Sequence, residues 1–433
     1  MAGFYNFSFY RHSNLFESFR TDLIELELVD RGKPFFPLFD LRKFMENLVP
    51  VISSKEVSFP TIPSSARSAI LVPSVRFDDN SRSIIGSLIG VANEETIVLI
   101  ADNSENIEKK KFLESIRKIN SNIFAVHHEK NIGGQGNFDY LFDWSEGVEF
   151  TALMADDDWI SPDYHLSAFR YLEKMPHLTG AAVGNSIIIH GSPRERTVDG
   201  SQPQMVGETP IERMRKWSGV TSRITMYNAS RRSALKNAAA YIRRTPIPAI
   251  TLLEDLWETN RLALGAFVTK PGKGFLVHNP TPTSSWQDIY QRLHGDSALP
   301  FSYIYFSALS TAIQLGIFHT GTLSPLKTKN DKTECVNHLF DHVFKKQFLA
   351  TVGGQEKAAR SQFSNHPHVL EGFLKYCMPP FPDQITFDQD ILEWYISLVD
   401  ALETKPKNGD APLSEKFRKF ASELLPEFHL KNS

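Results

Sequence analysis

Two kinds of apolar pattern alternate between residues 68 and 190. Short apolar runs predict buried strands, and the stretches between them carry apolar residues at helical spacing. The predicted strands cover 69–73, 96–101, 122–126 and 150–155, followed by an extended segment at 181–189. The predicted helices cover 81–92, 105–119, 136–144 and 163–174, and Ile107, Phe112, Ile116 and Ile119 are expected to face the core. This alternation indicates an α/β fold with a doubly wound, mainly parallel sheet and right-handed crossovers.

The segments on either side of this region have different patterns. Residues 1–67 mix aromatic and charged residues with clustered prolines, so we expect an N-terminal extension. Residues 68–300 form the expected α/β domain, in which 190–218 is loop-rich and 219–300 holds mixed elements. Residues 301–433 predict a mainly helical C-terminal region, with helices over 302–315, 335–349, 367–377, 388–402 and 414–424.

Composition narrows the class of protein. The net charge is −3, which gives no overall field for nucleic acid and leaves peripheral membrane contact open. Two cysteines, Cys335 and Cys377, argue against a disulfide framework and fit a cytoplasmic protein. No apolar run reaches the roughly 20 residues of a membrane-spanning helix, and no signal-peptide pattern opens the chain.

Polar residues with chemical potential follow the first two predicted strands. Pro73 and Arg76 end the first strand, where proline is also a common strand stop and arginine could meet a phosphate. Asp102 and Asn103 end the second strand. They could bind a nucleobase or, equally, cap the helix that follows.

The third and fourth strands lead to a glycine segment and an acidic triplet. Gly133 and Gly134 precede a helix, where free backbone N–H groups could face a diphosphate, although the spacing is not that of the dinucleotide motif. Asp156, Asp157 and Asp158 follow the fourth strand. An exposed turn or a helix N-terminus would also tolerate three carboxylates, but at this edge they offer the hard oxygen ligands of magnesium or manganese.

Two further groups lie about 60 to 100 residues later. Glu254 and Asp255 form an acidic pair among apolar residues, which suits a general base or, alternatively, the first turn of a helix. Trp217 and Arg223 could line a sugar pocket, and simple core packing is the alternative. His127 and His128 also end a strand and receive no role from the sequence.

In this order, the motifs resemble those of family 2 glycosyltransferases with the GT-A fold. The resemblance is clearest over 68–190 and looser over 219–285. It implies an inverting transferase that uses a nucleotide-diphosphate sugar, with a UDP-sugar favoured, and a glycan or other hydroxyl acceptor. A divalent cation, manganese or magnesium, is implied on the diphosphate.

The same resemblance implies roles for individual residues. Pro73 and Arg76 would lie in the nucleotide loop and Asp102 would read the base, with Asn103, Gly133, Gly134 and Asp157 also on the donor side. Asp156 would lie near the sugar or ribose, and Asp158, together with Asp156, would ligate the cation. Asp255 is the first choice of general base and Glu254 the second, while Trp217 and Arg223 would contact the acceptor.

The chain also departs from the family pattern. Ser74 and Val75 stand where an aromatic-Asn pair is common, and Gln291-Arg292 is only a fragment of the Gln-x-x-Arg-Trp motif of processive enzymes. Two alternatives therefore stay open: a catalytically degenerate GT-A domain that acts as a scaffold, and a sugar nucleotidyltransferase. The sequence does not fix the oligomeric state, the donor sugar, the nucleobase or the acceptor.

Overall fold

Strands β1 (Ser68–Ser74) and β2 (Thr96–Asp102) are buried along almost their whole length and form the centre of a parallel half-sheet. The computed structural model describes residues 59–156, 158–190, 197–199, 204–219, 227–247, 252–278, 300–349, 352–354, 356–403 and 410–430. β3 (Ile123–His127) pairs with β2, and β4 (Phe150–Leu153) pairs with β1, both in parallel. The carboxyl ends of β1, β2 and β3 therefore lie at one edge of the sheet.

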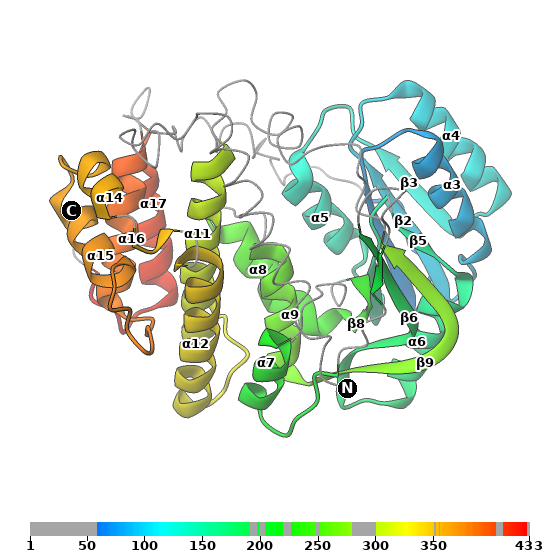
Figure 1. Cartoon of the computed structure of the whole chain (residues 1–433). Coiled ribbons are helices and arrows are strands. Elements are labelled where there is room, and N and C mark those ends of the chain that lie inside the picture. The colour runs from blue at the N-terminus through cyan, green and yellow to red at the C-terminus, as the bar shows by residue number, and fades with distance from the viewer. Residues whose placement is uncertain are drawn as a thin grey trace.

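Helices cover both faces of this half-sheet because its strands are apolar on both sides. In β2, Val98 and Ile100 belong to the core cluster that includes α3 (Asp79–Ser87), α4 (Ile107–Ile119) and α6 (Pro162–Lys174). Ile97 and Leu99 point the other way, into a second cluster with α5 (Gly133–Trp144). Alternate residues of one strand thus pack against opposite helical layers, as a doubly wound sheet requires (Figure 1).

The second half of the sheet is mixed. The strand order is β3-β2-β1-β4-β8-β6-β9-β5, where β8 is Ala229–Arg231, β6 is Leu178–His190, β9 is Ala266–His278 and β5 is Trp159–Ile160. β7 (Thr197–Asp199) pairs with β6 outside this path. β6 and β9 run parallel over their long register, while β8 and β5 are antiparallel to their neighbours. The acidic triplet lies where the chain passes from central β4 to edge strand β5.

Three central helices join the sheet to the C-terminal region (Figure 1). They are α7 (Pro210–Ser218), α8 (Lys236–Arg244), which follows a 3-10 turn at Arg232–Leu235, and α9 (Leu252–Leu264). Another 3-10 turn, at Leu88–Gly90, follows α3. The C-terminal helices are α11 (Pro300–Thr320), α12 (Lys329–Val343), a π-helix at Phe344–Leu349, α14 (Glu356–Gln362), α15 (Pro367–Cys377), α16 (Gln389–Leu402) and α17 (Leu413–Leu424).

One of the two apolar clusters extends from the sheet through the central helices into the C-terminal region. The cluster that begins at the sheet continues through Leu256 and Trp257 of α9 and into Leu309 and Ile313 of α11. The helical region is therefore packed directly on the helix that carries the Glu254-Asp255 pair. None of the helices that the structure describes combines the length and the apolar character needed to cross a bilayer.

The predicted α/β class is confirmed, as is the combination of a mainly parallel, doubly wound sheet with a mainly helical C-terminal region. Several predicted boundaries are wrong. α5 begins at Gly133 rather than 136, β4 ends at Leu153 rather than 155, and α7 lies in the segment predicted to be loop-rich. The predicted division into three parts at 67 and 300 stays a prediction, and residues 1–58 lie outside the described part of the chain.

The core face of α4 also differs from the expected one. Ile107 and Ile119, predicted to face the core, are 57% and 69% exposed. The buried positions are Lys109, Leu113 and Ile116, which follow the same helical spacing from a different starting point. A lysine therefore occupies a core-facing position beneath the strand ends.

Candidate functional site

Asp102, at the end of β2, is fully buried and held by two basic side chains. Its Oδ1 lies 3.0 Å from Lys109 Nζ, and its Oδ2 lies 2.6 Å from His127 Nδ1. The Ser104 N–H also donates to Oδ1 at 3.0 Å. Because a carboxylate only accepts, His127 Nδ1 carries the proton, and Nε2 is the ring nitrogen left for a ligand.

Asp156 is held in place by the loop that follows β1. Its Oδ2 accepts from Ser74 Oγ at 2.9 Å and from the N–H groups of Val75 and Arg76 at 2.8 Å each. Asp156 is 5% exposed, and these three hydrogen bonds all go to Oδ2. The carboxylate is therefore fixed by one oxygen, and the other is available.

Lys109 connects the two carboxylates. Its Nζ is 3.9 Å from Asp156 Oδ2 as well as 3.0 Å from Asp102 Oδ1, and the lysine side chain has no exposed surface. Burial lowers the pKa of the Lys109 ammonium from its ordinary value, while the charges of Asp102 and Asp156 act in the opposite direction. One buried cation thus offsets two buried carboxylates from different strand ends.

Asn103 anchors the glycine segment to the end of β2. Its Oδ1 accepts from the Ile132 N–H at 2.7 Å, and its Nδ2 donates to Asn131 Oδ1 at 2.7 Å. Gly133 has φ +73°, a conformation that glycine adopts without strain, and it is the first residue of α5. The glycines therefore form the N-terminal turn of a helix, where backbone N–H groups attract anions.

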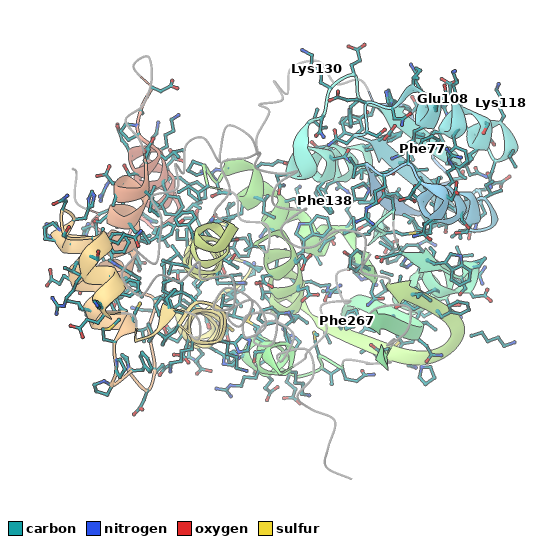
Figure 2. All side chains as sticks on the ribbon, turned by 45° about the horizontal axis from the view of Figure 1, so that its top comes forward. Phe77, Glu108, Lys118, Lys130, Phe138 and Phe267 are labelled. Carbon is teal, nitrogen blue, oxygen red and sulfur yellow. The ribbon has the colours of Figure 1, made fainter. Side chains whose placement is uncertain are left out.

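Glu254 and Asp255 occupy the first turn of α9 and differ in exposure. Glu254 is half-buried, whereas Asp255 has no exposed surface. Helix α5 contacts α9 through aromatic rings. The centroid of the Trp257 ring of α9 is 6.1 Å from that of Phe138 and 5.9 Å from that of Phe142, both of α5. Phe138, labelled in Figure 2, lies on the side of α5 that faces the central helices. This contact links the acidic pair to the helix that begins with the glycines.

Some predicted contacts do not suit the positions that the structure gives. Asp102 and Asp158 have no exposed surface, so direct contact of Asp102 with a base, or of Asp158 with a cation, would require rearrangement. The two oxygens of Asp102 are instead occupied by Lys109 and His127. Asp157 and Arg223 lie outside the described residues.

The structure does not support the acceptor contact predicted for Trp217. The indole was predicted to contact an acceptor, but it is 6% exposed and its Nε1 donates to Glu258 Oε2 of α9 at 2.5 Å. Its ring also meets His342 of α12, with centroids 6.0 Å apart. Core packing between α7, α9 and α12 therefore explains Trp217, as the alternative interpretation of the sequence had it.

The remaining predicted donor residues lie near the strand ends. Pro73 is half-buried in β1 opposite Ala101, and the backbone of Arg76 holds Asp156. Gly134 is exposed in the first turn of α5. The structure thus gathers the ends of β1 and β2, Asp156 and the α5 N-terminus, and it connects Glu254 and Asp255 to them through α9 and α5.

Three residues of this site were not assigned from the sequence: Lys109, His127 and Ser74. Lys109 could have been found because Lys109, Leu113 and Ile116 share one helical face, which places a lysine among apolar residues. His127 ends a strand adjacent to Asp102, but that pairing depends on the parallel register of β2 and β3. Ser74 gives no signal of its own.

Asp156 fits a divalent cation better than Asp158 does, because Asp158 has no exposed surface. Magnesium and manganese need one or two carboxylates, with diphosphate oxygens and water completing the shell, and the available Oδ1 of Asp156 provides one such ligand. No group of three or more metal-ligating side chains occurs among the residues that the structure describes. Two cavities in the described residues lie elsewhere, one among phenylalanines of the C-terminal helices and one at the amino ends of β1, β2 and β4.

Comparison with known proteins gives similar structures and no sequence relatives. No protein-family profile matches the chain, and no curated protein matches it in sequence. The chain is similar to crystal structures of Staphylococcus aureus TarS 1–349 in complex with UDP-GlcNAc (15% identity, 76% of this chain and 90% of that chain, TM-score 0.44) and in complex with UDP (16%, 82% and 90%, 0.41). At this identity and TM-score, the likeness supports no functional argument, so function must be argued from the site.

Proposed function

We propose that the chain is a glycosyltransferase that moves a sugar from a nucleotide-diphosphate donor to a hydroxyl acceptor. The observation that carries the proposal is the geometry of Asp156. Three donors from the loop after β1 fix one oxygen of this carboxylate, and the other oxygen remains available at the carboxyl edge of a doubly wound sheet. Ligands of open α/β sheets bind at this edge.

The donor would lie along the strand ends. The first turn of α5 supplies backbone N–H groups for the diphosphate, and Gly133 allows close approach. Asp102 is a positioning residue in this proposal: it holds His127 through Nδ1, which would leave the Nε2 of that histidine for the donor. Asp156 would hold manganese or magnesium, which when bound would neutralise charge on the diphosphate.

The acidic pair of α9 would supply the base. We propose Glu254 as the base because it keeps exposed surface, and Asp255 as a buried positioning residue. Glu254 takes the proton of the acceptor hydroxyl, whose oxygen forms a bond to the anomeric carbon. The bond from that carbon to the diphosphate oxygen breaks, its electron pair leaves with the diphosphate, and the configuration inverts.

A titration tests the donor site. UDP with manganese should bind the full chain, and Asp156→Asn should weaken that binding at least about tenfold, the size expected for one charge-assisted contact. The matched control is Asp163→Asn, which removes an exposed carboxylate from the first turn of α6. Equal UDP affinity in wild type and Asp156→Asn, measured by calorimetry, would refute the role of Asp156.

A second pair of variants tests the base. Glu254→Gln should lower sugar transfer or donor hydrolysis by about 100-fold or more while UDP binding is retained. UDP-GlcNAc, the ligand in the TarS crystal structure, is a suitable first donor, followed by a panel of other sugar nucleotides. Full activity in Glu254→Gln together with loss in Asp255→Asn would assign the base to Asp255 instead.

The same assays separate the alternatives. Binding of UDP without turnover of any sugar nucleotide would favour a degenerate domain that acts as a scaffold. Formation of a sugar nucleotide from a nucleoside triphosphate and a sugar phosphate would favour a nucleotidyltransferase. A cytoplasmic location with contact at the membrane face remains a proposal, which fractionation of cells would test.

A further inference from the structure

A buried side chain of the C-terminal region holds the backbone that leads into α9. Gln314 of α11 has no exposed surface, and its Nε2 donates to the carbonyl of Ile247 at 2.7 Å. Its Oε1 accepts from Thr245 Oγ1 at 2.5 Å. Both partners lie directly after α8, in the described start of the connection to α9, so one amide from α11 binds this segment at two points.

A second contact from α11 reaches the first turns of α9. The Thr259 hydroxyl donates to the carbonyl of Asp255 at 2.6 Å and lies 2.9 Å from His319 Nε2. Because that hydroxyl hydrogen is already used, His319 Nε2 is the donor to Thr259. Thr259 and His319 are both fully buried. α11 therefore holds α9 directly beneath the acidic pair as well as ahead of it.

The hydrogen bonds of Gln314 continue into the C-terminal helices. Gln314 Nε2 also donates to Ser310 Oγ at 2.9 Å, and Tyr395 of α16 donates to the same hydroxyl at 2.8 Å. Ser310 and Tyr395 have no exposed surface. Buried neutral hydrogen bonds of this kind fix one arrangement, because every alternative leaves a polar group without a partner away from water.

We propose that Gln314 and His319 are positioning residues for the Glu254-Asp255 pair, so that the C-terminal helices form part of the active centre. The contacts run through the backbone on either side of the pair rather than to the carboxylates themselves. The expected effect on turnover rests on the proposed glycosyltransferase function. The expected effect on the local order of α9 does not depend on it.

The experiment uses the full chain with two variants. Gln314→Met keeps the length of the side chain and removes its polar atoms, and Thr259→Val keeps the shape of the threonine and removes its hydroxyl. Ser414→Ala is the matched control, since it removes a hydroxyl bonded to Asp400 Oδ1 at 3.0 Å within the same helical region. Amide hydrogen exchange in the first two turns of α9 is measured first, followed by UDP binding and by turnover of a sugar nucleotide.

Both variants should speed exchange in the first two turns of α9 by at least about tenfold relative to wild type and to Ser414→Ala. They should also lower kcat by a similar factor with UDP affinity within about twofold of wild type, because the donor contacts lie at the strand ends. Unchanged exchange in both variants, or faster exchange with unchanged kcat, would overturn the proposal. If wild-type protein binds no UDP and turns over no donor, the proposed function fails, and the exchange result alone decides whether α11 positions the pair.

Discussion

Buried polar groups are stabilised in different ways at the strand ends and in the C-terminal helices. At the strand ends, Asp102, Lys109 and Asp156 are charged groups held by ion pairs and by donors from the backbone. In the helices, Ser310, Gln314 and Tyr395 are neutral groups joined in a chain of hydrogen bonds. Charges are costly to bury and tend to remain where a ligand needs them, whereas neutral networks fix geometry at lower cost.

The difference predicts that removing Lys109 has the largest effect on stability. Lys109→Met leaves two buried carboxylates without their cation, and breaking a buried ion pair of this kind costs about 3–5 kcal/mol. Lys111→Met is the control on the same helix, because Lys111 pairs with Glu108 at 2.8 Å on the exposed side. Urea unfolding should give less than about 1 kcal/mol for the control. Equal losses in the two variants would remove the distinction between paired charge and surface charge.

Within the described part of the chain, His165 is neither ion-paired nor part of a hydrogen-bond network. It is a buried titratable group whose ring nitrogens have no hydrogen-bond partner among the described residues. Burial lowers its pKa to about 3 in the folded protein, against an ordinary value of about 6.5 in the unfolded chain. Below pH 6.5 the unfolded chain therefore binds the extra proton, so this group reduces stability as pH falls toward 3.

Replacing His165 should remove that acid sensitivity. The free energy of unfolding of His165→Leu minus that of wild type should rise by about 2 kcal/mol between pH 7 and pH 5, whatever the packing change costs at pH 7. Chemical denaturation at both pH values measures it. A constant difference would mean that His165 does not stay neutral and buried as the structure has it.

Alanine substitutions at two neighbouring glycines test the role of backbone conformation at the N-terminus of α5. Gly133→Ala forces φ +73° on an alanine and should cost about 1–2 kcal/mol, with weaker UDP binding. At Gly134 a β-carbon would meet no atom within 4 Å, so Gly134→Ala should be neutral or stabilising by up to about 1 kcal/mol. Thermal unfolding compares them, and the same loss in both would show that backbone conformation at Gly133 is not what matters.

The smallest effect is expected for the neutral network. Tyr395→Phe removes the hydroxyl that donates to Ser310 but keeps the ring in the core, so the expected loss is about 1 kcal/mol. A loss as large as that of Lys109→Met would contradict the contrast between the two regions. Urea unfolding under the same conditions provides the comparison.

Much of the fold was predictable from local pattern, and the differences have physical causes. The apolar runs that became β1, β2 and β3 were found because buried parallel strands are apolar on both faces. The helix face of α4 was misjudged because Ile107 and Ile119 look more like core residues than Lys109 does. Helical spacing allows either face to be buried, and the choice depends on the ion pairs that Lys109 forms with Asp102 and Asp156.

The sequence by itself determined the alternation of strands and helices, and with it the edge of the sheet at which Asp102, the glycines and Asp156 come together. These features follow from the periodicity of side chains and the handedness of crossovers. Only the tertiary structure decided that Asp102 is buried and bonded to His127, that Asp156 has an available oxygen, and that Trp217 belongs to the core. The reason is that exposure and partner choice depend on segments far apart in the chain, as when Gln314 of α11 holds the entry to α9.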